Sequence, residues 1–211
     1  MENQQYCTAA LSDIRQAFDK VWHPGLLFKI KRILPSSYFN LLKSYLNERQ
    51  FETQFNGENS SCLHIHSSVP QGSILGPLLY VLYKSDLSTS WETTLRTFMD
   101  DTAIFATQED PTIASLNLQE HLHIEKWLKK WKIKVNESKS SHVTSTLQKG
   151  HCPAVNINQT IIPQTEVVKY LGLHFDCRLN LKEHNARKRK QIDLKTKEIN
   201  WLIEKKNPIY L

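Results

Sequence analysis

Three aspartates of this sequence have the type and placement needed for phosphoryl-transfer chemistry. Asp13 ends one run of strand-forming residues, and the adjacent pair Asp100 and Asp101 separates two such runs in "TFMDDTAIFA". Because neighbouring carboxylates repel each other, we expect a cation close to the pair. Oxygen ligands at this density suit Mg²⁺ or Mn²⁺, and two such ions can stabilise both the attacking and the leaving oxygen of a phosphoryl transfer.

A purely structural interpretation of the same aspartates stays open. Asp13 can cap the helix that follows it, and the pair can form a surface turn, because Asp is common where a hairpin reverses. Asp-Asp is nevertheless a poor turn, since favoured two-residue hairpins have Gly or Asn in the second place. The spacing alone does not separate the two interpretations.

The elements around the aspartates predict an α+β fold in which helices pack on an antiparallel sheet. We expect helices after Pro24 and Pro35, a buried helix in "LLYVLYKSDL", one helix over residues 113–131, and a basic helix at the end of the chain. Strands are expected at residues 7–14, 132–136 and 167–175, and hairpins at 51–66 and around the Asp pair. In a single sheet these strands would bring the three aspartates to one rim.

The helix after Pro35 is expected to face the core along one side. Its apolar residues recur at helical spacing. They are Tyr38, Leu41, Leu42, Tyr45 and Leu46.

The composition is that of an ordinary globular protein. The 211 residues are 40% apolar and 23% charged, which allows one good core or two small ones. No apolar run approaches the roughly 20 residues of a membrane span, and no basic and apolar leader opens the chain. The four cysteines lie far apart, which argues against a zinc site or a disulfide framework and favours a reducing compartment.

The net charge of +6 is concentrated near the end of the chain. Residues 182–206 contain nine lysines and arginines against four acids. Such a cluster commonly contacts phosphate, although a solvated helix face would have the same composition. The charge alone does not decide between these two interpretations.

Five motifs, in their order along the chain, resemble the palm motifs of reverse transcriptases, specifically those of jockey-type non-LTR retrotransposons. The resemblance extends from about residue 9 to about residue 190. The motifs are "LSDIRQAFDKVWHPGLL", "VPQGSILGPLLYVLYKSDL", "TFMDDTAIFA", "WLKKWKIKVNESKS" and "VVKYLGLHFDCRLNLKEH".

The resemblance implies a metal site and a nucleotide site. Asp13 and Asp100 match direct ligands of two Mg²⁺ or Mn²⁺ ions, and Asp101 matches the residue that supports them. Phe18 matches the aromatic residue under the incoming sugar, where a ring excludes a 2′-hydroxyl; a core Phe beside Trp22 is the plainer interpretation.

Three further matches concern the nucleotide and the primer. Gln71 and Gly72 match the loop against the nascent base pair, or else form a tight turn before the next helix. Lys139 matches a residue that assists the pyrophosphate leaving group, and a plain surface lysine is the alternative. The remaining match is the primer grip, Tyr170, Leu171 and Gly172, which also suits a buried strand. Separately from the resemblance, the basic cluster leads us to expect contacts to the nucleic-acid backbone at Arg187, Lys188, Arg189 and Lys190.

The resemblance further implies a right-hand polymerase palm over residues 1–175, with partial fingers at 24–68 and the start of the thumb at 176–211. The implied activity is RNA-directed DNA polymerisation in the nucleus or cytoplasm, with an RNA template, a DNA primer and deoxynucleotides, and with no membrane and no obligate protein partner. Two alternatives are a catalytically inactive remnant that binds nucleic acid through the basic segment, and an unrelated metal-dependent phosphohydrolase.

The sequence also departs from the family pattern. Met99 stands where these elements usually have Ala, Arg15 replaces a small residue, and Lys84 in "KSDL" is expected to disturb local packing. Full members carry fingers before the first aspartate motif and a longer thumb after the last. We therefore expect this chain to bind template-primer and to extend it poorly.

Overall fold

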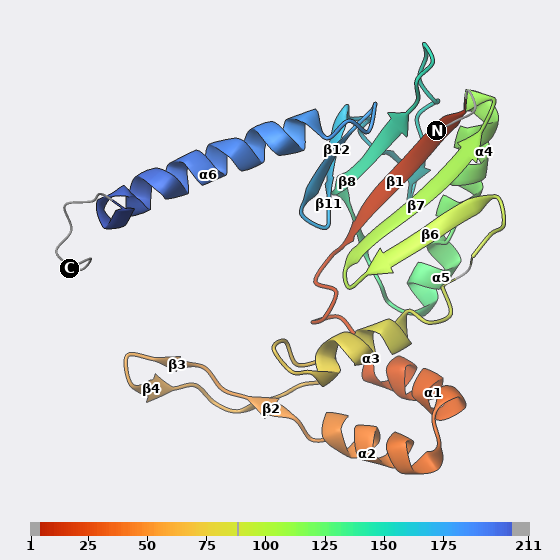
Figure 1. The fold of residues 1–211 in the computed structure, drawn as a ribbon. Coiled ribbons are helices and arrows are strands. Elements are labelled where there is room, and N and C mark those ends of the chain that lie inside the picture. The colour runs from red at the N-terminus through yellow and green to blue at the C-terminus, as the bar shows by residue number, and fades with distance from the viewer. Residues whose placement is uncertain (1–4, 88, 204–211) are drawn as a thin grey trace.

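The computed structural model describes residues 5–87 and 89–203, and its centre is a four-stranded antiparallel sheet (Figure 1). The strand order is β6-β7-β1-β8, so β1 lies between β7 and β8. The connection between β6 and β7 is a two-residue turn at Met99 and Asp100. The strands of this sheet are β1 (Tyr6–Ile14), β6 (Thr93–Phe98), β7 (Asp101–Gln108) and β8 (Val135–Ser145).

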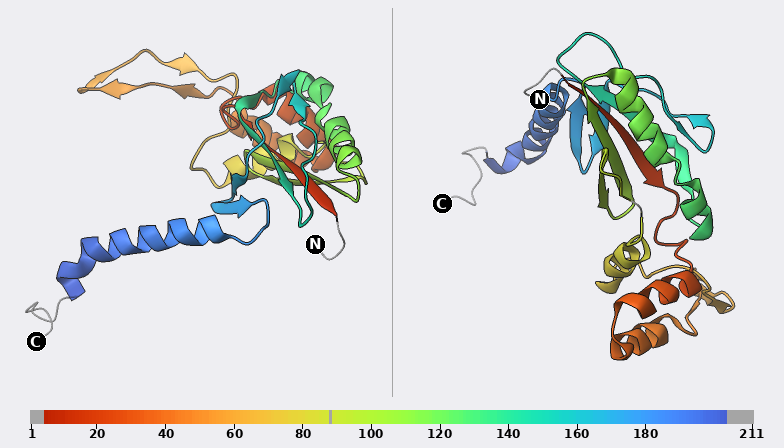
Figure 2. Two further views of the ribbon diagram at one scale, coloured as in Figure 1. Left: turned by 90° about the horizontal axis from the view of Figure 1, so that it is seen from above. Right: turned by 90° about the vertical axis from the view of Figure 1, so that its right-hand side faces the viewer.

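The two faces of the sheet have different covers, because side chains alternate between the faces of a strand. On one face lie α4 (Pro111–Leu122) and α5 (Glu125–Lys130), as Figure 2 shows from the side. On the other face, Ala9 of β1 and Val143 of β8 pack with Val168 of the hairpin formed by β11 (Val167–Tyr170) and β12 (Leu173–Asp176). The sheet is therefore covered on both faces around its central strands, whereas most of the edge strand β6 is exposed.

Three helices lie beyond the rim of the sheet at which β1 ends (Figure 1). They are α1 (His23–Ile33), α2 (Ser36–Leu46) and α3 (Leu75–Tyr83). Pro24 lies in the first turn of α1, where its missing N–H costs nothing. Leu26 and Ile30 of α1 and Leu79 of α3 are fully buried in the same core that extends under the sheet.

Two elements project from this body in Figures 1 and 2. One is a long hairpin arm made of β2 (Gln50–Phe51), β3 (Gln54–Phe55), β4 (Glu58–Asn59) and β5 (Leu63–His64), which turns at Asn56-Gly57. The other is α6 (Lys182–Ile203), which packs against β12 and then extends away from the sheet. Within the described ranges, no helix is long and apolar enough to cross a membrane.

The α+β expectation and most predicted elements are confirmed, but five details differ from the prediction. The helix expected over residues 113–131 breaks at His123, and the strand expected at 132–136 begins at Val135 and continues to Ser145. Residues 167–175 form a hairpin rather than one strand. A small hairpin of β9 (Asn156–Ile157) and β10 (Thr160–Ile161) was not expected.

The fifth difference concerns the expected core-facing side of α2. Only Leu42 and Leu46 of the five apolar residues are buried, whereas Tyr38 and Leu41 are 60% and 66% exposed and Tyr45 is half-buried. The helix packs mainly against α1, so much of its apolar stripe lies without cover.

Candidate active site

The strand register places Asp13 directly opposite Asp101. These residues are partners in the antiparallel pairing of β1 and β7, in which opposite side chains point to the same face. Asp13 follows Ala9 and Leu11 at two-residue steps, so its face is the one covered by the β11–β12 hairpin. Asp100 precedes Asp101 in the turn, and Met99 supplies the positive φ of that turn, at 51°. The three aspartates therefore reach one rim of the sheet.

Electrostatic interaction among the three aspartates is visible in the pKa of Asp101. Burial raises this pKa, and the charges of Asp100 and then Asp13 raise it further, while Lys84 and Lys169 oppose the rise. The rim is therefore short of positive charge.

The carboxylates alone do not enclose a metal ion. In residues 5–87 and 89–203, no three His, Cys, Asp or Glu side chains are grouped closely enough to hold one. Mg²⁺ in polymerase sites is usually bound by one or two carboxylates together with substrate phosphates, so a pair such as Asp13 and Asp101 suits it. The donor chemistry and the shortage of positive charge both fit a divalent cation.

Asn136 is the hydrogen-bond donor beside Asp13. Its Nδ2 donates to Asp13 Oδ2 at 3.4 Å, and its own Oδ1 accepts from Ser138 Oγ at 2.9 Å. The pairing of β1 with β8 is irregular here, because Asp13 pairs with Asn136 whereas Leu11 pairs with Ser141. Asn136 was not anticipated from the sequence, since only the register shows that it reaches the aspartate.

Lys139 lies in the same irregular stretch of β8. Residues 137–140 bulge out opposite Ser12, and the Lys139 side chain is exposed. Bulges beside active sites commonly redirect a side chain. The structure thus puts Lys139 on the strand segment next to Asp13 without a contact to it.

Lys84 is buried under the turn that carries Asp100. Its side chain is 6% exposed, and its Nζ donates to the carbonyl oxygen of Met99 at 2.5 Å. The same Nζ lies 4.9 Å from the centre of the Tyr80 ring. Burial lowers the pKa of Lys84 to about 8, against the opposing charges of Asp100 and Asp101. The expected disturbance of packing is therefore wrong, because the side chain is fully accommodated.

Phe18 rests on Tyr80 at the edge of the core. Its ring centre is 5.0 Å from that of Tyr80, and its side chain is half-buried. Burial raises the pKa of the Tyr80 hydroxyl, and the charges of Asp100 and Asp13 add to this, so Tyr80 lies within the field of the rim. Phe18 therefore packs on a core tyrosine that is within the field of the carboxylates, and part of its own ring is exposed.

The loop before α3 holds Gln71 and Gly72. Gln71 Nε2 donates to Asp19 Oδ1 at 3.1 Å, and Gly72 has a φ of +82° in open space. The crowded glycine is Gly76, where an added Cβ would lie 2.5 Å from the carbonyl oxygen of Pro70. Gly76 could not be singled out from the sequence, because its constraint comes from the fold of the loop.

The hairpin of Tyr170, Leu171 and Gly172 lies on the carboxylate face. Leu171 and Gly172 have φ values of 48° and 79°, as a tight turn of the I′ kind requires. Burial raises the pKa of Tyr170, and the charge of Asp101 raises it further, which puts Tyr170 near that carboxylate.

The basic residues of α6 lie away from the carboxylates. Arg187 Nε donates to Glu183 Oε1 at 2.6 Å, and Lys188, Arg189 and Lys190 are exposed. Lys205 and Lys206, the last two lysines of the basic segment, lie outside the described residues. The helix offers a solvent-facing positive surface.

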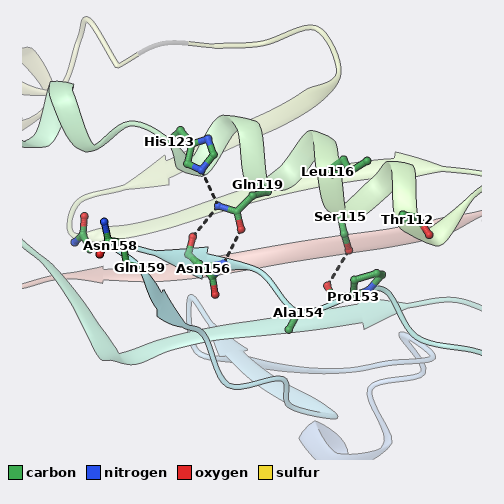
Figure 3. A pocket seen from close by; sticks show the side chains of 10 residues that line it. All are labelled: Thr112, Ser115, Leu116, Gln119, His123, Pro153, Ala154, Asn156, Asn158 and Gln159. Atoms are coloured by element: carbon green, nitrogen blue, oxygen red, sulfur yellow. Dashed lines mark hydrogen bonds between the residues drawn. The ribbon is translucent and has the colours of Figure 1, made fainter.

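The cavity in Figure 3 is separate from the aspartates. It has a volume of about 400 Å³ and lies between α4 and the loop that leads into β9. Gln119 bridges the two, because its Nε2 donates to Asn156 O at 3.1 Å and its Oε1 accepts from Asn156 N at 2.7 Å. None of the residues predicted to carry chemistry lines this cavity.

Comparison with known proteins gives both family and fold. The family model described as reverse transcriptase (RNA-dependent DNA polymerase) matches residues 1–175. The chain is 37% identical over 220 residues to the RNA-directed DNA polymerase from mobile element jockey of Drosophila melanogaster, covering 100% of the chain and 24% of that protein. It is also 37% identical over 216 residues to the probable RNA-directed DNA polymerase from transposon X-element of the same fly, with the same coverage.

Solved telomerases of Candida tropicalis share the fold. One without its C-terminal domain superposes with a TM-score of 0.59 at 13% identity, over 84% of this chain and 35% of the other. One in complex with a fragment of telomeric RNA gives 0.60 at 12% identity, over 84% and 29%. The chain described here spans about a quarter of the length of its curated relatives.

Proposed function

Because this chain belongs to the reverse transcriptase (RNA-dependent DNA polymerase) family, we propose that it forms the palm of an RNA-directed DNA polymerase encoded by a mobile element. The observation that carries the proposal is the register of β1 and β7, which sets Asp13 opposite Asp101 with Asp100 in the adjoining turn. Carboxylates on the two central strands of a four-stranded sheet have little freedom to move, and rigid positioning is what phosphoryl transfer requires.

Asp13, Asp100 and Asp101 would hold Mg²⁺ or Mn²⁺, two ions in all. When bound, these ions supply activation of a primer 3′-hydroxyl and charge stabilisation at the attacked phosphate. The protein's own part is to keep the carboxylates oriented, and Asn136 does this for Asp13 by donating to its Oδ2. Lys139 would face the leaving pyrophosphate from the bulge of β8.

The nucleotide would lie over Phe18, whose ring is held from below by Tyr80. A ring fixed at this place collides with a 2′-hydroxyl and so favours deoxynucleotides. Gln71 and Gly72 would contact the nascent base pair, and Tyr170, Leu171 and Gly172 would hold the primer end. The nearness of Tyr170 to Asp101 supports that arrangement, because a primer end must reach the carboxylates.

In this proposal residues 1–175 form the palm, with partial fingers at 24–68, and residues 176–211 begin the thumb. Arg187, Lys188, Arg189 and Lys190 would contact the backbone of an RNA template and DNA primer, since all of them are exposed on α6. The duplex would be held by its shape and charge rather than its sequence. No obligate protein partner is part of the proposal.

We place the protein inside the cell, in the nucleus or the cytoplasm. The four cysteines are free thiols in this fold. Free thiols suit a reducing compartment. They are Cys7, Cys62, Cys152 and Cys177.

A segment exchange tests the activity. The 211 residues replace the matching segment of the jockey polymerase, and extension of a DNA primer on an RNA template is measured with Mg²⁺. We expect extension that Asp100→Asn reduces at least about a hundredfold, because the transition state loses charge compensation. Glu109→Gln, an exposed change just past the opposite end of β7, is the control and should be silent.

A second candidate function is nucleic-acid binding without catalysis, which the exposed basic face of α6 favours. An exchanged protein that binds template-primer but does not extend it would establish this function and refute the polymerase. Release of phosphate from a nucleotide without a primer would instead indicate a phosphohydrolase.

A further inference from the structure

A buried lysine contacts the turn that carries Asp100. Lys84 follows the last residue of α3 and is buried below the β6–β7 turn. Its Nζ donates to the Met99 carbonyl oxygen at 2.5 Å and lies over the Tyr80 ring. This contact joins a helix outside the sheet to the turn that bears the aspartate pair.

A buried ammonium is costly unless its charge is compensated. The other buried ammonium of this core, Lys29, is compensated by an ion pair with Asp86 at 2.5 Å and by the Trp131 ring, 3.6 Å from Nζ to ring centre. Lys84 forms no ion pair with any carboxylate in the part of the chain that the structure describes. The negative charges that act on it are those of Asp100 and Asp101.

Two lysines provide the positive charge that acts on Asp101. Asp101 is partly buried beside two like charges, and the cations that act on it are Lys84 from below and Lys169 from the β11–β12 hairpin. Lys169 is exposed and its charge is screened by water, whereas that of Lys84 is not. Lys84 is thus the desolvated cation that faces the pair.

We propose that Lys84 is a positioning residue and resident cation of the aspartate turn, which it holds through the Met99 carbonyl while it offsets part of the charge of Asp100 and Asp101 in the absence of divalent ions. The metal part of this inference rests on the proposed function. A fixed positive charge next to a divalent-ion site weakens binding of the ion, because like charges repel over this short distance. Lys84 therefore stabilises the metal-free protein and lowers its affinity for divalent ions.

The first experiment tests the coupling of Lys84 to the aspartates without any metal. Urea unfolding of the 211-residue chain in EDTA is measured for Lys84→Met, Asp101→Asn and the double variant. We expect Lys84→Met to change the unfolding equilibrium constant at least about fivefold more in the parent than in the Asp101→Asn background, because the attraction between Lys84 and Asp101 exists only in the parent, whereas that to Asp100 is common to both. Additive effects would overturn the resident-cation role whatever the function of the protein.

The second experiment measures Mn²⁺ affinity of the same chain from the electron paramagnetic resonance signal of free Mn²⁺. Lys84→Gln keeps a donor for the Met99 carbonyl and removes the charge, whereas Lys84→Met removes both and Lys84→Arg keeps both. We expect Mn²⁺ to bind about tenfold more tightly to the Gln and Met variants and equally to the Arg variant. A role as a tether alone would weaken binding by the Met variant and leave the Gln variant at the parental affinity.

Asp13→Asn separates failure of this inference from failure of the proposed function. If Asp13→Asn abolishes Mn²⁺ binding and the Gln and Met variants match the parent, the metal site stands and the inference about Lys84 is wrong. If Asp13→Asn leaves Mn²⁺ binding unchanged, the assignment of the metal site to these aspartates is wrong. The urea unfolding of the single and double variants in EDTA then decides the role of Lys84. Circular dichroism of each variant confirms that the chain is folded.

Discussion

The Nζ of Lys29 lies 2.5 Å from Oδ1 of Asp86, and this pair ties α1 to the end of the α3 region. The ammonium is 4% exposed and lies against the Trp131 ring, whereas the carboxylate is 45% exposed and also accepts from Trp127 Nε1 at 3.0 Å. Burial lowers the pKa of Lys29, and the hydrogen bond and charge of Asp86 oppose that change. One exposed carboxylate thus compensates a deeply buried cation.

Loss of the carboxylate should cost more stability than loss of the cation. Asp86→Asn leaves the Lys29 ammonium buried without a counter-charge, which should lower the free energy of unfolding by about 1–2 kcal/mol after allowance for solvent screening of Asp86. Lys29→Met fills the space against the Trp131 ring and leaves only a half-exposed carboxylate without its partner, so the loss of stability should be smaller. Urea unfolding checks the order, with Lys31→Met on the exposed side of α1 as control. A larger loss for Lys29→Met would contradict this account.

Phe18→Ala should relax the selection of deoxynucleotides. In an active exchanged polymerase, the ratio of kcat/KM for a ribonucleotide to that for a deoxynucleotide should rise at least about tenfold, because the ring no longer meets the 2′-hydroxyl. Phe39→Ala, which removes another half-buried aromatic ring at α2, should leave the ratio unchanged. An unchanged ratio in the Phe18 variant would return this residue to a packing role against Tyr80.

Stability should fall as the pH falls below about 6.5, the usual pKa of histidine. Burial lowers the pKa of His121 and His142, so the folded chain resists protonation that the unfolded chain accepts. The unfolded state therefore binds more protons in acid, and the free energy of unfolding decreases through the folded pKa values. Each histidine adds a slope of at most about 1.4 kcal/mol per pH unit.

Replacement of a single histidine checks that origin of the pH dependence. His142 is fully buried and hydrogen-bonded to Thr8 at 2.5 Å, so His142→Gln should lower stability at pH 7 and flatten its decrease toward pH 5. His151 is exposed, and His151→Gln should leave the profile as it is. A profile that stays equally steep without His142 and His121 would assign the acid sensitivity to other groups.

The basic face of α6 should give binding of an RNA/DNA duplex a steep salt dependence. Replacement of Arg187, Lys188, Arg189 and Lys190 by Gln should reduce the slope of log affinity against log salt by about one unit for each phosphate that is no longer neutralised. The charge-matched control changes exposed residues elsewhere. They are Lys31, Arg32, Lys43 and Lys126. Equal losses of affinity in both variants would mean that net charge, rather than α6, determines binding.

Local patterns were sufficient for much of the fold. Runs of strand-forming residues indicated β1 and the β6–β7 hairpin, and Pro24 indicated the start of α1. The break at His123 has neither Gly nor Pro to mark it. The β11–β12 turn begins with Leu171 in a positive-φ conformation, which Leu rarely adopts, so the sequence resembled one continuous strand.

Some features of the site could likewise be predicted from local sequence patterns, whereas others depend on contacts between distant residues. Convergence of Asp13 with Asp101 followed from one expectation, a single antiparallel sheet, and the register bears it out. Lys84 was misjudged because a lysine inside an apolar helix signals a packing defect until its partner is known. The partner, the Met99 carbonyl, is fifteen residues away and becomes a neighbour only when the hairpin folds back over α3.

Asp13 lies on β1, which is a central strand of the sheet and should be among the most stable parts of the molecule. Hydrogen bonds to β7 on one side and β8 on the other protect the β1 backbone, so its amides should exchange with solvent only when the whole sheet opens. β6 is an edge strand and can fray alone, which would loosen Asp100 in the adjoining turn without displacing Asp13. Displacing Asp100 therefore requires less free energy than displacing Asp13, because the first needs only fraying of β6 and the second needs opening of the whole sheet. Mild heating should disturb the turn at Asp100 first.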